Sequence, residues 1–99
     1  ISPDTDEVSL IGPPLPGFQK WYGGVIGSDN AIYGIPNCAS SVLRIVPDTG
    51  EVSTIGELPS GGWKWHGATV GEDGAIYGIP AHAESVLKIV PATGQVRII

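Results

Sequence analysis

A gapless repeat of 44 residues runs through this chain. Residues 31–52 read AIYGIPNCASSVLRIVPDTGEV, and residues 75–96 read AIYGIPAHAESVLKIVPATGQV. Between Lys20 and Ile55, 22 of the 36 positions carry the same residue 44 positions later. A chain with such self-similarity folds as successive copies of one structural unit, because equal sequences adopt equal local structures. The repeat therefore predicts two complete units in 99 residues.

The N-terminus belongs to the same pattern. PDTDEVSLIG at residues 3–12 lies 44 residues before PDTGEVSTIG at residues 47–56. We interpret residues 1–12 as the end of a third unit, which contributes one outer strand to whichever unit comes before the first.

Each complete unit is expected to form four short strands. In the first copy these are residues 23–27, 31–35, 41–46 and 51–55, which are rich in Val and Ile and are separated by Gly, Pro and Asp. No stretch of ten residues combines a helical period with freedom from Gly and Pro, so helices are disfavoured. The sequence thus predicts an all-β protein.

The second copy contains two motifs that are typical of a known repeat. The hairpin DGAIY (73–77) followed by VLKIVPATGQV (86–96) resembles the blades of NHL and SMP-30-like β-propellers. The resemblance implies two four-stranded antiparallel blades, blade 1 over residues 20–56 and blade 2 over residues 64–99. It implies no function, because enzymes, lectins and scaffolds all use this fold.

Two blades leave two apolar sheet faces uncovered, and propellers usually close at four to eight blades. We therefore expect copies of the chain to be one another's partners, in a six-bladed ring made by trimerisation. An eight-bladed tetramer and a piece of a longer continuous array are the alternatives. In a ring, residues 1–12 of one copy would compete with residues 95–99 of its neighbour for one sheet edge, and we expect the N-terminal segment to act as the latch between subunits.

The loops at one end of the predicted blades hold most of the aromatic, Lys and His residues. The candidate ligand-binding residues are Trp21, Tyr22, Trp63, Lys64, Trp65 and His66. Trp and Lys side chains can stack a sugar or aromatic ligand and pair with an anion. The repeated Trp and Lys residues are also explained by packing between blades, with each Lys reaching water. Tyr22 and His66 are equivalent positions at the start of the innermost strands.

We predict a binding or interaction module, with a small polar or carbohydrate ligand at this loop face. The alternative is an enzyme, a hydrolase or lyase, centred on His66 at the mouth of the channel. SMP-30-like enzymes hold a divalent cation with carboxylates near the channel, whereas the innermost strands here, YGGVIG and HGATVG, carry none. Asp29 and Asp73 are assigned to turns. No metal and no cofactor is expected.

Charge and composition limit the other partners. The net charge is −5 and the five basic residues are scattered, which argues against binding nucleic acid. No apolar run approaches the roughly 20 residues that cross a bilayer, so no membrane partner is expected. The single cysteine, Cys38, excludes an intrachain disulfide. The cellular compartment stays open.

Overall fold

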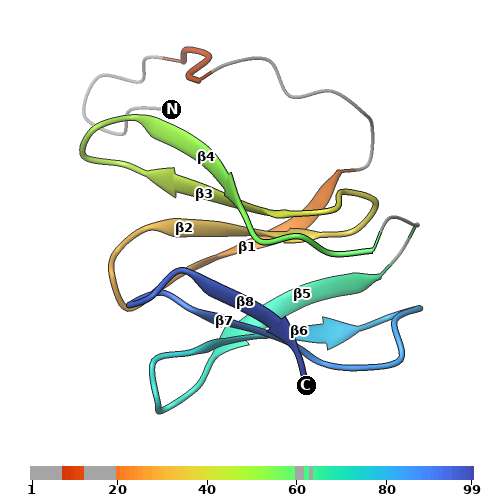
Figure 1. The fold of residues 1–99 in the computed structure, drawn as a ribbon. Helices are drawn as coiled ribbons and strands as arrows, with labels where there is room; N and C mark the ends of the chain where they lie inside the picture. The colour runs from red at the N-terminus through yellow and green to blue at the C-terminus, as the bar shows by residue number, and fades with distance from the viewer. Residues whose placement is uncertain (1–7, 13–19, 60–61, 63) are drawn as a thin grey trace.

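The computed structural model describes residues 8–12, 20–59, 62 and 64–99, and it arranges them as two four-stranded antiparallel sheets (Figure 1). In each sheet the strands follow one another in sequence order. The first sheet contains β1 (Trp21–Ile26), β2 (Ile32–Pro36), β3 (Val42–Val46) and β4 (Glu51–Ile55). The second contains β5 (Trp65–Val70), β6 (Ile76–Pro80), β7 (Leu87–Val90) and β8 (Gln95–Ile98). The predicted all-β class and the four strands per repeat are confirmed.

The hairpin turns follow from the turn residues of the repeat. Asn30 and Gly74 have φ of 66° and 81°, and the preceding aspartates each accept the N–H of the residue two positions on at 3.1 Å. Gly50 and Gly94, with φ of 74° and 72°, close the β3–β4 and β7–β8 turns. Only the second residue of each Asp-Asn or Asp-Gly pair adopts positive φ, and the side chain of the aspartate before it holds the turn by its hydrogen bond.

Asp29 does more than shape its turn. The Tyr33 hydroxyl donates to Asp29 Oδ2 at 2.7 Å, and the Arg44 guanidinium donates to the same oxygen at 3.2 Å. Arg44 Nε also donates to the Tyr33 hydroxyl at 3.2 Å. The network therefore joins the β1–β2 turn, β2 and β3 of blade 1. Burial raises the pKa of Asp29, but the hydrogen bonds from Tyr33, the Ala31 N–H and Arg44 outweigh it and hold the pKa below 3.8.

This network gives blade 1 a predictable pH response. A carboxyl group whose pKa is lowered by folding stabilises the protein above its unfolded pKa, and that stability is lost as pH falls through the lowered value. We expect Tyr33→Phe to cost about 1 kcal/mol at neutral pH and to reduce the loss of stability on acidification below about pH 4. Urea denaturation at a series of pH values measures both effects. An unchanged acid response in Tyr33→Phe would contradict the role assigned to the hydroxyl.

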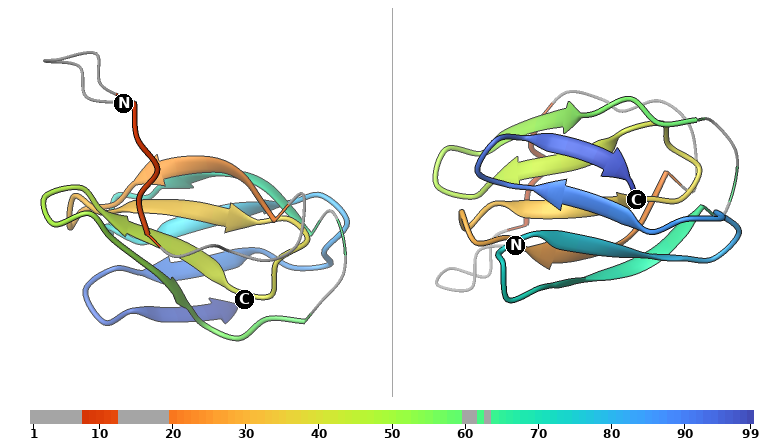
Figure 2. Two further views of the ribbon diagram at one scale, coloured as in Figure 1. Left: turned by 90° about the horizontal axis from the view of Figure 1, so that it is seen from above. Right: turned by 60° about the horizontal axis from the view of Figure 1, so that its bottom comes forward.

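The two sheets lie one upon the other, and the core is the layer between them (Figure 2). The innermost strands, β1 and β5, approach so closely that a Cβ on Gly23 would lie 3.5 Å from the Gly67 Cα. Farther out, a Cβ on Gly56 would lie 2.7 Å from the Cβ of Val96. The segment after β4 therefore packs directly on the outer strand of the next sheet. Glycine at these two positions lets backbone meet backbone or side chain without a gap.

Equivalent side chains of the two blades differ in burial according to the sheet face on which they lie. The side chains that blade 1 turns toward blade 2 are buried; they include Tyr33, Ile35 and Val42. The equivalent side chains 44 positions later lie on the far face of blade 2 and are half-buried or exposed; they are Tyr77, Ile79 and Val86. The reverse holds for the other pair of faces (Trp65, Ile76, Leu87 and Ile89 buried; Trp21, Ile32, Leu43 and Ile45 half-buried). The two outer faces therefore repeat the two surfaces that already fit together inside the chain.

Residues 8–12 do not form a strand, although the sequence predicts one over residues 7–11. A strand needs a hydrogen-bonding neighbour, and no strand among the described residues pairs with this segment. Its position is nonetheless informative, because a Cβ on Gly12 would lie 2.7 Å from Val52 Cγ2, as one on Gly56 would from Val96. The assignment of residues 1–12 to a preceding blade stays a prediction.

Candidate functional site

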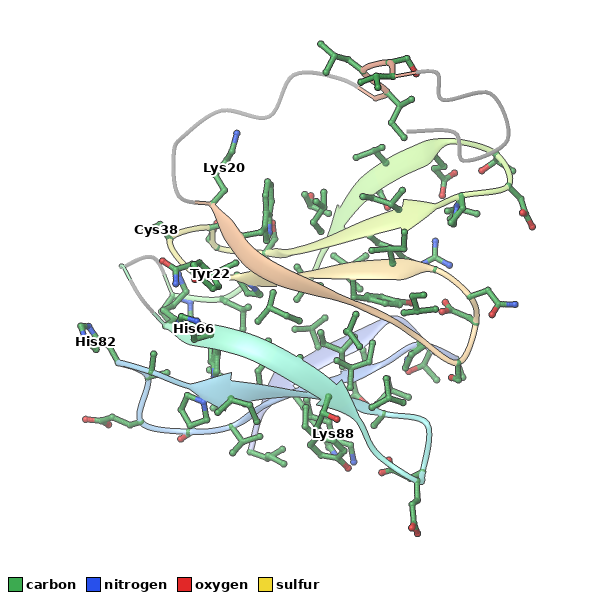
Figure 3. All side chains as sticks on the ribbon, turned by 180° about the vertical axis from the view of Figure 1, so that it is seen from behind. Lys20, Tyr22, Cys38, His66, His82 and Lys88 are labelled. Atoms are coloured by element: carbon green, nitrogen blue, oxygen red, sulfur yellow. The ribbon has the colours of Figure 1, made fainter. Side chains whose placement is uncertain are left out.

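The loops β2–β3 and β6–β7 and the starts of β1 and β5 lie at one end of the sheets, as the sequence predicts (Figure 3). The carbonyl oxygen of Lys20 accepts the N–H groups of Asn37 and Ala39 at 2.9 and 3.1 Å. The same pattern recurs 44 residues later around the Lys64 carbonyl. Each loop is thus fastened to the entry of its own innermost strand, which gives this end a defined surface.

Tyr22 and His66 meet at the entry to the innermost strands. Their ring centroids lie 4.0 Å apart with the planes tilted by 47°. Tyr22 is 49 % exposed and His66 is also exposed, so the pair presents aromatic edges and an imidazole to the outside (Figure 3). The structure brings these two predicted site residues into direct contact across the two blades.

The repeated tryptophans make the same hydrogen bond, each within its own blade. Trp65 is only 1 % exposed, and its indole N–H donates to the Ser85 carbonyl at 2.9 Å. Trp21 makes the equivalent bond to the Ser41 carbonyl at 2.9 Å but is half-buried, since no blade covers its side. This degree of burial is what packing between the blades predicts, and the assignment of Trp21 and Trp65 as ligand-binding residues stays a prediction. Trp63 lies outside the described residues.

Lys64 is also largely buried. It is 7 % exposed, and burial lowers the pKa of its ammonium group although the nearby Cys38 thiol acts in the opposite direction. Its backbone N–H donates to the Asn37 carbonyl at 3.2 Å, which ties the loop of blade 1 to the start of blade 2.

Asn37 is the residue of this region that the sequence analysis missed. It is buried, and its Nδ2 donates to the Trp65 carbonyl at 3.4 Å, so it fixes the entry of β5 against blade 1. Its repeat mate is Ala81, which has no such group. The change from Asn to Ala between two otherwise identical IYGIP segments was the available signal.

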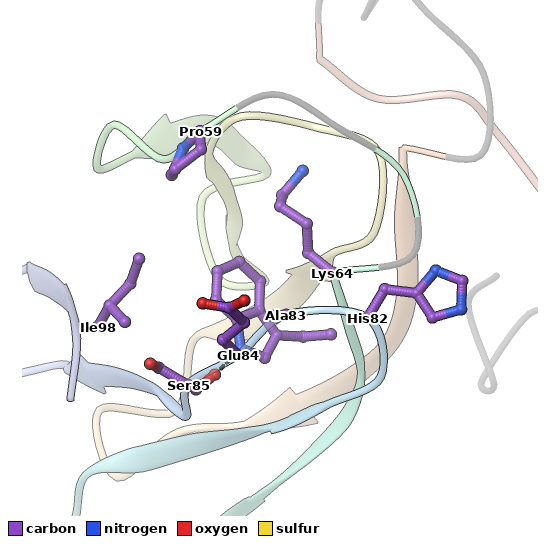
Figure 4. A pocket seen from close by; sticks show the side chains of 8 residues that line it. Pro59, Lys64, His82, Ala83, Glu84, Ser85 and Ile98 are labelled. Atoms are coloured by element: carbon purple, nitrogen blue, oxygen red, sulfur yellow. Dashed lines mark hydrogen bonds between the residues drawn. The ribbon is translucent and has the colours of Figure 1, made fainter.

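A cavity of about 440 Å³ opens at this end, beside blade 2 (Figure 4). Two of the predicted site residues, Lys64 and Trp65, line it. The other walls come from the segment after β4, the β6–β7 loop and β8, including Pro59, His82, Glu84 and Ile98. The cavity thus combines an apolar floor with an ammonium group, an imidazole and a carboxylate, a composition suited to a small polar molecule.

No group of three or more His, Cys, Asp or Glu side chains that could hold a metal ion occurs in the described part of the chain. Cys38 and His82 lie on different blades, and Figure 3 shows them separated. Among the same residues, no helix has the length and apolar character needed to cross a membrane.

Comparison with solved structures decides the fold. The chain is similar to a catalytically inactive histidine-to-alanine variant of virginiamycin B lyase from Staphylococcus aureus, solved with quinupristin, with a TM-score of 0.69 and 23% sequence identity. The selenomethionine-substituted virginiamycin B lyase from the same organism and a streptogramin B lyase give the same values. These neighbours are β-propellers.

The chain is a pair of β-propeller blades. The match covers 86% of this chain but 28% of each of those lyases, so the chain spans less than a third of their length. At this identity the likeness establishes the fold alone. No protein-family model matches the chain, and no curated protein does.

Proposed function

We propose that this chain is the building unit of a propeller ring that closes by self-association and acts as a binding module. The observation that carries ring closure is the pairing of its faces. The far face of blade 2 repeats the surface that blade 1 presents to blade 2, and the outer face of blade 1 repeats the surface that receives it. Copies can therefore join head to tail through the same contact that joins the blades inside one chain.

Two further observations support closure. Exposed Ile79 lies on the far face of blade 2 and exposed Ile26 on the outer face of blade 1, and soluble proteins rarely leave large apolar patches bare. The similar lyase chains are roughly three times as long as this one, given the shares of each chain that match. Three copies therefore supply about as much chain as one of those propellers, which favours the trimer over the tetramer.

Within the ring, we assign the ligand site to the cavity beside blade 2. Its volume falls in the range of small-molecule pockets, roughly 300–1,000 Å³. Lys64 and Glu84 place opposite charges at its walls and His82 adds a hydrogen-bonding imidazole, so a small hydroxylated or zwitterionic ligand fits this chemistry. Each subunit would carry one such site, and the ring would bind a repetitive ligand several times at once.

A glycan array followed by calorimetry tests the site. We expect the strongest carbohydrate on the array to lose about tenfold or more in affinity with His82→Ala, which removes an exposed wall residue. His66→Ala is the matched control, because this exposed histidine lies at the same end but outside the cavity. A silent array would exclude a carbohydrate, and equal losses in both variants would contradict the cavity as the site.

The second candidate is a lyase or hydrolase activity at His66. It is favoured by the exposure of His66 at the strand entry beside Tyr22, and by the similar virginiamycin B lyase being inactive when a histidine is replaced by alanine. Incubation with quinupristin, followed by mass spectrometry for a new product, distinguishes the two. Turnover that His66→Ala abolishes and His82→Ala keeps would establish the enzyme, whereas no turnover leaves the binding module standing.

A further inference from the structure

We propose that residues 7–11 of one copy replace β8 at the edge of blade 2 in the neighbouring copy, pairing with β7. The inference rests on the ring closure proposed above and names the segment that joins the subunits. It is argued from the position of Gly12, from the charges along the outer strands and from the segment that follows each outer strand.

Gly12 packs on blade 1 as the glycine that follows the outer strand of blade 1 packs on blade 2. Gly56, directly after the outer strand of blade 1, packs on Val96 of blade 2, and Gly12 packs on Val52 of blade 1 in the same way. Both glycines have φ of 78°. Residues 8–11 therefore lead into Gly12 as the outer strand of blade 1 leads into Gly56, which is what the fourth strand of a preceding blade would do.

Charge favours the incoming strand over β8. In blade 1, Arg44 of β3 lies opposite Ser53 and forms an ion pair of 3.7 Å with Glu51. In blade 2, Lys88 of β7 lies opposite Arg97 of β8, and like charges facing each other across strands are destabilising.

The N-terminal segment restores the pattern of blade 1. Moving the β3–β4 register by 44 residues places Ser9 opposite Lys88 and brings Glu7 to the position of Glu51. The exchange substitutes one set of main-chain hydrogen bonds for another, so the side chains decide which strand holds the edge. A repulsive pair is lost and an attractive pair is gained.

The segments after the outer strands agree. Leu58, two residues after Gly56, is buried in the core, and its N–H donates to the Ser40 carbonyl at 2.7 Å. The N-terminal copy also carries a Leu-Pro pair, with Leu15 three residues after Gly12. The likeness of the two segments is one of sequence, a Leu-Pro pair shortly after the glycine that ends an outer strand.

The exchange changes the candidate ligand site. Ile98 of β8 lies opposite Leu87 and lines the cavity. In the shifted register, Leu10 of the neighbouring copy lies opposite Leu87 and takes over this wall. The cavity is therefore completed by a second copy of the chain.

Disulfide trapping in the full chain tests the exchange, with Cys38→Ser removing the native thiol. The register places Ile11 opposite Val86 of the neighbour, as Ile55 lies opposite Val42. We expect Ile11→Cys with Val86→Cys to give covalent dimers and trimers under oxidising conditions. The matched control is Ile99→Cys with Val86→Cys, since Ile99 N–H donates to the Val86 carbonyl in the single chain, and we expect little crosslinking within that chain.

The reverse result, crosslinks within single chains for the control and none between chains for the test pair, would overturn the exchange. Arg97→Glu provides an independent test, because it turns the repulsive pair into an attractive one and should shift crosslinking toward the control pair. The mass of the uncrosslinked protein separates this proposal from ring closure. An oligomer without Ile11–Val86 crosslinks would leave the ring standing and remove the exchange, whereas a monomer would remove both.

Discussion

We expect Ile79→Glu to convert the assembled protein into a folded monomer. Ile79 is 49 % exposed in the single chain, whereas its repeat mate Ile35 is completely buried between the blades. If copies join through the repeated surface, Ile79 becomes as buried as Ile35, and a carboxylate there has to be taken out of water without a partner. The affinity between subunits should fall by about a hundredfold or more, measured by sedimentation velocity over a range of concentrations.

Ala92→Glu is the matched control for Ile79→Glu. Ala92 is exposed in the β7–β8 turn, at the opposite end from the candidate site, and its change adds the same charge without touching either outer face. It should leave the oligomer intact. An Ile79→Glu protein that assembles as well as Ala92→Glu would show that this face does not join subunits.

The largest loss of stability is expected from Trp65→Ala. This side chain is buried between the blades and carries the hydrogen bond to Ser85, so its removal leaves a cavity and an unpaired carbonyl group. Such truncations cost about 3–5 kcal/mol, a large part of the stability of a small domain. Urea denaturation followed by far-ultraviolet circular dichroism measures the loss.

Trp21→Ala is the comparison that gives the Trp65 result its meaning. In a single chain Trp21 is half-buried, and its truncation should cost clearly less than that of Trp65. In a closed ring the two tryptophans occupy equivalent interfaces and the two losses should approach each other. A stable Trp65→Ala protein that has lost only ligand binding would contradict the packing role of this residue.

The fold could be predicted because the residues that mark its turns and strands act locally and occur in both copies of the repeat. Gly50, Gly94 and the Asp-Asn and Asp-Gly pairs mark the turns, and alternating Val and Ile residues mark the strands between them. A 44-residue period with four such strands leaves few architectures other than a blade. The structure adds the role of Asp29 as the centre of a network, which depends on Tyr33 and Arg44 meeting across three segments.

The site was less predictable, because it depends on which surface a neighbouring blade covers. Trp21 and Trp65 are the same residue in the same repeat position, yet one is half-buried and the other is enclosed. Asn37 reaches the Trp65 carbonyl only because the two sheets stack with this offset. The strand predicted at the N-terminus is absent from residues 8–12, where no described strand pairs with this segment.

The mass of the 99-residue chain in solution tests the central claim most directly. Its own mass is 10.2 kDa. Light scattering coupled to size-exclusion chromatography should give three times this mass for the six-bladed ring, with four times indicating the eight-bladed alternative. A well-folded chain that stays at 10.2 kDa at high concentration would contradict closure by self-association.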